Sequence, residues 1–256
     1  MSGGFNSYSY SDNLPKRLGL IKKVVSKSDA DFVGLIDTFR WRQIFTEKEL
    51  QEHFGYKNVF CIDMDDDRVE KEIGLTVLTN LDTKFEKIRI HNRNCIKSTI
   101  KNAGRGYTLW TVYLDDLNED TRLEETKSLL DKVSPKHTIL MGDFNSFSRE
   151  DLKYFSQTMN QVKNNIPKEL ESLKKVLRGM QRCEIVTLLE KRGFINGIPE
   201  FKPTIPTKLF PGNFEKPFIR VDYVFHTNDI KLKKTGVLDS PLLQKTSDHL
   251  PIWFEV

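Results

Sequence analysis

Three short acidic motifs in the second half of the chain carry the residues best suited to chemistry. They are Gly142-Asp143-Phe144-Asn145, Arg220-Val221-Asp222-Tyr223 and Ser247-Asp248-His249-Leu250. In each motif an aspartate stands at or beside the end of an apolar run, where a strand can aim a carboxylate into a cleft and keep its apolar residues buried. Three carboxylates, an amide and an imidazole suit Mg²⁺ or Mn²⁺ and an attack on phosphorus.

The spacing within these motifs matches what hydrolysis of a phosphodiester requires. Asp143 and Asn145 stand two residues apart, so in an extended segment their side chains face the same side. One can hold the attacking water while the other donates to a phosphoryl oxygen. His249 needs an acid that orients its ring, and Asp222 is the natural candidate. Because Asp248 and His249 are adjacent, a turn rather than a strand must bring both side chains into one cleft.

The first half of the chain alternates between helical and extended patterns. Apolar residues at helical spacing predict a helix over 14–25, and a buried strand that ends at Asp37 follows. Two further strands are predicted over 57–62 and 72–79, with a polar turn between them, and another over 107–114.

The second half contains the elements that would carry the acidic motifs. Asp116 and Glu119 have the spacing of a capping box, which predicts a helix that Pro135 terminates. A short strand over 137–141 then delivers Asp143. Residues 148–194 are lysine-rich and show helical spacing, so we expect two or three helices there.

A loop rich in phenylalanine and two closing strands complete the chain. The loop over 196–217 holds Phe201, Phe210 and Phe214 and leads to Phe218; the strands are VDYVF and PIWFEV. No repeat or linker divides the sequence. We therefore expect a single α/β domain over residues 1–256, in which helices lie outside mixed strands and 148–194 forms a helical insertion.

Composition excludes several classes of protein. With 38% hydrophobic residues among 256, the chain can bury a sizeable core and does not have a disordered composition. A net charge of +4 fits a polyanionic partner, although lysine-rich soluble proteins have similar values. Cys61, Cys95 and Cys183 are isolated and form no CxxC, which argues against zinc and favours an intracellular, cytoplasmic protein with reduced thiols.

No apolar run approaches the ~20 residues that span a bilayer, and no signal peptide is recognisable, so we expect no transmembrane segment. A secreted protein remains the alternative if a signal segment was removed. We expect a monomer.

Taken together, the three motifs resemble the signature motifs of the endonuclease/exonuclease/phosphatase superfamily, whose members include proteins similar to exonuclease III and DNase I. Their order and spacing match over essentially the whole chain. The resemblance implies a four-layer α/β/β/α sandwich of two mixed sheets flanked by helices. It also implies cleavage of phosphate esters with Mg²⁺ or Mn²⁺ as the cofactor.

The resemblance also implies a role for each matching residue. Asp143 would orient the attacking water, and Asn145 would bind the substrate and stabilise the transition state. Asp222 would pair with His249, which would bind the scissile phosphate or transfer a proton. Asp248 would help to bind the metal.

The matches in the first half are less complete. Asn6 resembles a residue that assists metal or phosphate binding. Asp37 stands where the superfamily normally has a metal-binding glutamate, which shortens the ligand by one methylene. Tyr113 stands where a phosphate-contacting histidine is common; alternatively, it is an aromatic residue packed in the sheet. Arg105, in a glycine-flanked turn, could reach a phosphate.

Three functions are compatible with these residues. The first is a Mg²⁺-dependent nuclease acting on DNA or RNA, which the mild basicity favours. The second is a lipid or inositol phosphate hydrolase, in which the phenylalanine-rich loop would contact an acyl chain or a membrane. The third is a catalytically weak binding protein, for which Asp37 and Tyr113 are the grounds. A predicted basic helix face could contact nucleic acid or anionic lipid, but solvated faces often look the same; it consists of Lys174, Lys175, Arg178 and Arg182.

Overall fold

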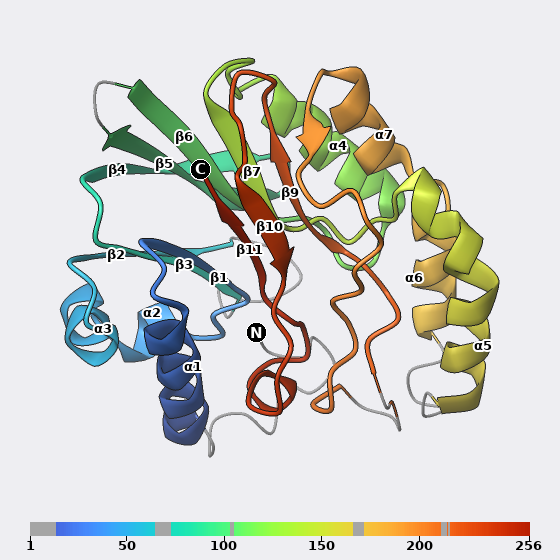
Figure 1. Ribbon diagram of the computed structural model, residues 1–256, viewed down its shortest axis with the longest axis horizontal. Coiled ribbons are helices and arrows are strands. Elements are labelled where there is room, and N and C mark those ends of the chain that lie inside the picture. Colours follow the sequence, from blue (N-terminus) through green and yellow to red (C-terminus); the bar gives the residue numbers. More distant parts are fainter. Residues whose placement is uncertain (1–13, 65–72, 103–104, 166–171, 211–213, 215) are drawn as a thin grey trace.

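A six-stranded mixed sheet forms the centre of the molecule (Figure 1). The computed structural model describes residues 14–64, 73–102, 105–165, 172–210, 214 and 216–256. The strands, in their order across the sheet, are β4 (Thr83–Ile90), β5 (Arg93–Asn102), β6 (Arg105–Tyr113), β7 (Thr138–Asp143), β9 (Asp222–His226) and β8 (Ile195–Asn196). Only β6 and β7 run parallel within this sheet, so the chain must cross over between them.

Two smaller antiparallel sheets pack against one face of the central sheet. One has the order β1 (Phe32–Ile36), β3 (Gly74–Thr79), β2 (Asn58–Asp63), and the other pairs β10 (Lys234–Val237) with β11 (Ile252–Glu255). Leu75 and Val77 of β3 share a buried cluster with Ile96 of β5. Phe254 of β11 packs near Leu109 of β6 in another. These apolar contacts hold the two sheet layers together.

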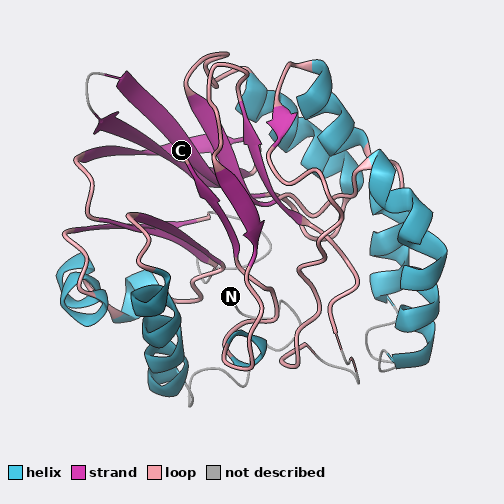
Figure 2. Ribbon diagram, in the orientation of Figure 1, coloured by secondary structure: helices cyan, strands magenta, loops and turns pink. Residues whose placement is uncertain are grey.

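Helices cover both outer faces, as Figure 2 shows. On the central sheet, α4 (Glu119–Leu130) and α7 (Glu184–Lys191) bury Leu129 and Ile185 against Trp110. On the three-stranded sheet, α1 (Leu14–Ser28), α2 (Trp41–Ile44) and α3 (Glu47–Phe54) form the opposite layer, with Leu18 and Leu50 in its core. The predicted four-layer α/β/β/α sandwich is thus confirmed. Its second sheet layer differs in detail, because the described strands there form two antiparallel groups.

A third group of helices lies beside the sandwich. It consists of the 3₁₀ helix η3 (Arg149–Tyr154), α5 (Phe155–Asn165) and α6 (Ser172–Met180). Val162 of α5 and Leu177 of α6 pack with Val221, which immediately precedes β9. A last 3₁₀ turn, η5 (Leu243–Lys245), precedes β11. Within the described residues no helix is long and apolar enough to span a membrane.

The start of α4 differs from the predicted capping box. Asn118, not Asp116, is the N-cap: its side-chain oxygen accepts hydrogen bonds from the backbone N–H groups of Asp120 and Thr121. The Asp115 carboxylate accepts from the backbone of Leu117 and Asn118 and so shapes the preceding turn. The prediction was wrong by two residues because several polar side chains here can serve as caps.

Gly142 fixes how closely β6 and β7 approach at the end that carries Asp143. It faces Val112 in the parallel register and has φ 141°, a backbone conformation that residues other than glycine rarely adopt. A Cβ added at this position would lie 1.9 Å from the Val112 carbonyl oxygen. Since that atom belongs to the backbone of the central sheet, it cannot move aside without distorting the strands.

Replacing Gly142 with alanine will therefore destabilise the protein by about 3 kcal/mol or more, because strain and steric overlap add. For a chain of this size, that lowers the Tm by about 6 °C or more in thermal unfolding. Gly19→Ala is the matched control: Gly19 lies inside α1 with no atom within 4 Å of an added Cβ, so it should gain about 0.5–1 kcal/mol. An unchanged Tm for Gly142→Ala would contradict this account.

Candidate active site

The ends of three neighbouring strands bring together the residues that the sequence singled out. Tyr113 ends β6 opposite Asp143, which ends β7, and Asp143 in turn faces Asp222, which begins β9. All three residues therefore lie side by side at one end of the central sheet. Asp143 is buried, and Asp222 is only 12% exposed at its side chain.

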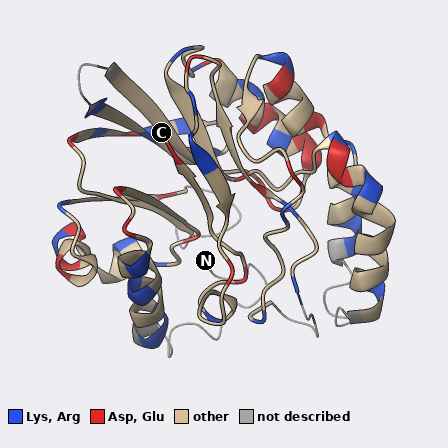
Figure 3. Cartoon of the chain, in the orientation of Figure 1, with Lys and Arg blue, Asp and Glu red and all other residues tan. Residues whose placement is uncertain are grey.

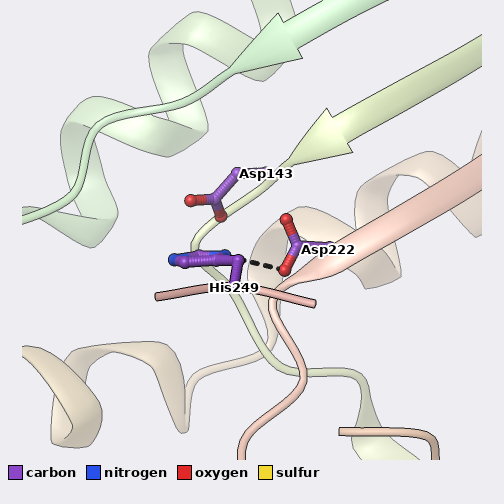
Figure 4. A group of neighbouring side chains, drawn as sticks. All are labelled: Asp143, Asp222 and His249. Atoms are coloured by element: carbon purple, nitrogen blue, oxygen red, sulfur yellow. Dashed lines mark hydrogen bonds and ion pairs between the residues drawn. The ribbon is translucent and has the colours of Figure 1, made fainter. Parts of the chain in front are cut away.

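His249 reaches this cluster from the loop between η5 and β11. Its Nδ1 lies 2.9 Å from a carboxylate oxygen of Asp222, as Figure 4 shows. A carboxylate can only accept, so the proton of this hydrogen bond belongs to Nδ1. The bond orients the ring and leaves Nε2 as the nitrogen that can meet a substrate.

The cluster is crowded with negative charge. Burial raises the pKa of Asp143 above its usual range, and the neighbouring Asp222 carboxylate adds to the shift while His249 opposes it. For His249, burial lowers the pKa, but the Asp222, Asp248 and Asp143 carboxylates outweigh burial and raise it to about 10. His249 is therefore an imidazolium at neutral pH and balances part of the charge of the surrounding acids.

Asn145 is held by a tight turn after β7. Its backbone adopts φ 47°, a left-handed conformation that asparagine tolerates better than most residues. The backbone N–H donates to Asp143 at 2.9 Å, and the side-chain amide donates to the Leu114 carbonyl at 3.1 Å. The expected extended geometry is thus replaced by a turn, because β7 ends at Asp143. The two side chains are nevertheless kept together.

Asp37 and Tyr113 approach the same centre from the two sheet layers. Asp37 follows β1, is buried and has φ 55°. Burial raises the pKa of Tyr113 well above its usual value, and the carboxylates of Asp116 and Asp37 raise it further. Tyr113 also packs in the apolar cluster between the sheets. It therefore serves as a packed aromatic residue and also faces the acidic centre.

A cavity of about 990 Å³ contains the centre. Seven predicted site residues line it: Asp37, Tyr113, Asp143, Asn145, Asp222, Asp248 and His249. Asn6 lies outside the described residues. Arg105 begins β6, whereas Tyr113 ends it, so their backbones are about 26 Å apart at ~3.3 Å per residue. The side chain of Arg105 lies outside what the structure describes, but its backbone is not at the site.

A segment that the sequence did not indicate fixes the loop that carries Asp248 and His249. The Thr207 hydroxyl donates to the Ser247 carbonyl at 2.5 Å, and the Thr207 N–H donates to the Asp248 carbonyl at 3.0 Å. The Leu250 N–H donates to the Thr204 carbonyl at 2.8 Å. The segment 204–207 therefore holds the loop that carries Asp248 and His249 through three hydrogen bonds.

A buried ionic network fixes the start of β9 in a similar way. The Arg220 guanidinium pairs with Asp151 of η3 at 2.8 Å, and the Tyr223 hydroxyl donates to the same carboxylate at 2.9 Å. Arg220 and Tyr223 flank Asp222 in the sequence. An arginine inside an apolar run was the only sequence signal for this network.

Several of these acids could hold a divalent cation. Ligand atoms of Asp143, Asp222 and His249 lie within 4.8 Å of one another. Asp248 is buried, and among the described residues its carboxylate accepts one hydrogen bond, from the Ser247 hydroxyl at 3.4 Å. Buried carboxylates are stable only when paired or bound to a cation, so the donor set fits a hard metal ion such as Mg²⁺.

Asp222→Asn will cost about 2 kcal/mol of unfolding free energy at pH 6, where His249 is charged. A pKa raised to about 10 means that the stabilisation by Asp222 is complete below pH 6.5 and disappears as the pH rises through 10. Urea unfolding of the metal-free protein at several pH values measures this. Asp229→Asn, which breaks the exposed His137–Asp229 pair, is the control. A cost that does not shrink toward pH 10 would contradict the assignment.

Thr207→Val will destabilise the protein by about 1–2 kcal/mol, because the buried Ser247 carbonyl loses its donor. Thr204→Val is the matched control: Thr204 is equally buried, but its hydroxyl has no hydrogen-bond partner among the described atoms, so valine should be neutral or slightly stabilising. Chemical denaturation distinguishes them, and equal effects would show that Thr207 acts only by its shape.

Comparison with known proteins agrees with this geometry. A sequence model of the Endonuclease/Exonuclease/phosphatase family matches residues 3–249. No curated protein matches the sequence at a significant level.

Among solved structures, a family protein from Leptotrichia buccalis has a TM-score of 0.64 at 14% identity, covering 100% of this chain and 97% of that one. The endonuclease domain of TRAS1, a telomere-specific non-LTR retrotransposon, has a TM-score of 0.58 at 16% identity, with 94% and 92% covered. A mannosyl-6-phosphatase from Bacteroides thetaiotaomicron has a TM-score of 0.58 at 16% identity, with 99% and 95% covered.

Identities this low show a shared fold and no more. The family match spans nearly the whole chain, however, and includes the strand ends and the loop that form the acidic centre. The chain therefore belongs to the endonuclease/exonuclease/phosphatase family.

Proposed function

We propose that this chain is a divalent-metal-dependent phosphodiester hydrolase, and that its substrate is DNA or RNA. The observation that carries the proposal is the position of His249, which is hydrogen-bonded to Asp222 and lies beside the buried Asp143 in one cavity. This arrangement joins a cation for the phosphate with a carboxylate for the water, as an attack on phosphorus requires.

Each residue has a distinct task in this proposal. Asp143 orients the attacking water and accepts its proton. His249, held by Asp222, uses Nε2 to bind a phosphoryl oxygen or to protonate the leaving oxygen. Asn145 donates from its amide to the phosphoryl oxygen on which charge develops. Tyr113 borders the same cavity opposite Asp143, and we expect its side chain to contact the phosphate.

Asp37 and Asp248 are the residues that we expect to hold Mg²⁺ or Mn²⁺. The Asp222–His249 hydrogen bond already occupies one ligand atom of each of those residues, and Asp143 is assigned to the attacking water. Of the buried aspartates that line the cavity, Asp37 and Asp248 therefore remain as the metal ligands. A bound divalent cation would offset the negative charge of the phosphate that otherwise repels a nucleophile. The shorter Asp37 in place of glutamate remains compatible, because Mg²⁺ commonly keeps several waters.

The alternatives differ in the substrate or in activity. A lipid hydrolase would present an exposed apolar rim, but Phe210 and Phe214 are each only 8% exposed. Phe210 packs edge-on against Phe214, whose ring also contacts Phe218. A phosphatase acting on a sugar phosphate has a precedent in the solved structure from Bacteroides thetaiotaomicron. A binding protein without activity would retain the fold but show no metal-dependent turnover.

An activity panel tests these alternatives. Wild-type protein should cleave DNA or RNA oligonucleotides with Mg²⁺ or Mn²⁺ and lose activity in EDTA. His249→Ala should lower kcat by about 10²–10⁴-fold, because it removes the acid and the cation for the phosphate. His137→Ala is the matched control, since His137 also pairs with an aspartate but precedes β7, at the opposite end from Asp143.

Turnover of inositol phosphates, sphingomyelin or sugar phosphates without nucleic acid cleavage would overturn the proposed substrate and leave the proposed mechanism in place. Full activity in EDTA or in His249→Ala would overturn the mechanism itself.

A further inference from the structure

Basic residues from three separate segments lie around η5, the 3₁₀ turn that precedes the loop with Asp248 and His249. Lys245 ends η5, is exposed and stands three residues before Asp248. Lys208 is exposed in a second segment, the turn over 207–209, and its backbone N–H donates to the side-chain oxygen of Gln244 in η5 at 3.3 Å. Arg17 of α1 donates to the Thr246 carbonyl at 3.5 Å. These contacts place α1, η5 and the 207–209 turn around one rim of the site.

Helix α1 extends this positive charge. Its apolar residues face the core, and four exposed lysines lie on its solvent side: Lys16, Lys22, Lys23 and Lys27. Lys16, Lys23 and Lys27 are spaced by seven and four residues, so they share one face. The helix has no acidic residue. Figure 3 shows the basic segments α1, η5 and the 207–209 turn along the same edge of the molecule.

Few acids on the described segments compensate this charge. For Lys208, Lys245 and the four exposed lysines of α1, the described residues show no ion pair, although Asp239 lies near η5 and bonds to Gln244 at 2.8 Å. Asp29 follows the last turn of α1. By contrast, Arg182 on the basic face predicted from the sequence is already paired with Asp120 and Glu184, each at 2.6 Å.

We propose that this basic rim, formed by Lys208, Lys245 and the lysines of α1, binds phosphates that flank the scissile phosphate in a nucleic acid strand. The inference rests on the proposed nuclease function. The acidic centre repels a polyanion, and a metal ion bound there would compensate at one phosphate only, so neighbouring phosphates need separate cations. A small phosphate ester lacks the flanking phosphates that the rim would bind. The rim therefore favours a polymeric substrate.

The test compares two double variants. In Lys208→Ala/Lys245→Ala the rim loses two cations. Lys136→Ala/Lys191→Ala is the matched control: both lysines are exposed and without an ion pair among the described residues, and they lie where β7 begins and where α7 ends. A third variant, Lys16→Ala/Lys23→Ala, tests the part of the rim on α1. All six residues are exposed, so folding should not be affected.

The quantity to measure is KM for a single-stranded oligonucleotide of about twelve residues, a length within the range that single-strand sites cover. Each lost phosphate contact should reduce the slope of log affinity against log salt by ~0.7, so between 50 and 200 mM salt the wild type should lose affinity about sevenfold more than either rim variant. The control variant should behave as the wild type does. KM for bis(p-nitrophenyl) phosphate should be the same in all proteins.

Two results would overturn the rim. One is an unchanged KM and salt slope for oligonucleotides in both rim variants while the wild type cleaves them; the nuclease function would then stand alone. The other is an equal change for the small ester, which would show a general effect on the site. A wild-type protein that hydrolyses the small ester but neither binds nor cleaves oligonucleotides would overturn both the rim and the nucleic acid substrate.

Discussion

The hydrogen bond between His249 and Asp222 is the interaction on which the other features of the site depend. Burial alone would lower the pKa of the His249 imidazole and raise the pKa of the neighbouring Asp143 carboxyl, so both groups would tend to be neutral. The carboxylates around the ring outweigh burial and raise the pKa of the imidazole. The protonated ring then supplies one positive charge within the centre. The remaining negative charge suits a divalent metal ion, which could in turn bind a phosphate.

The fold supplies this arrangement through constraints that lie outside the motifs. Gly142 lets β6 and β7 come close at the end where Tyr113 and Asp143 meet. Left-handed turns at Asp37 and Asn145 direct the chain away from the strands just where a polar residue is needed. Thr207 and the Arg220–Asp151 pair then fix the two segments that bring His249 and Asp222 together.

Much of this could be predicted from the sequence, for identifiable reasons. The aspartates at strand ends predicted the acidic centre. Apolar periodicity predicted one helix and seven strands: α1, β1, β2, β3, β6, β7, β9 and β11. The strands β4 and β5 were missed, since their alternating charged residues, as in Thr83–Ile90, resemble a solvated surface. The short helices α2 and α3 and the strand β10 carry too few apolar residues to give a clear period.

The supporting contacts could not have been predicted. Thr207 and Ser247 are 40 residues apart, and nothing in either segment specifies their hydrogen bond. Asp116 was interpreted only as a helix cap, and its ion pair with Arg93 at 2.9 Å beside Tyr113 was missed, because the pairing depends on how β5 lies beside β6. Conversely, Arg105 was placed in a glycine-flanked turn from which it could reach a phosphate, whereas its backbone begins β6 at the opposite end from Tyr113.

The stereochemistry at phosphorus tests the central claim most directly. If Asp143 directs a water at the phosphorus while His249 assists the leaving group, hydrolysis is one in-line displacement. Cleavage of an oligonucleotide with a chiral phosphorothioate at the scissile position, in isotopically labelled water, should then proceed with inversion. Retention would require two displacements through a covalent enzyme intermediate, with His249 as the obvious nucleophile, and would contradict the roles assigned to both residues.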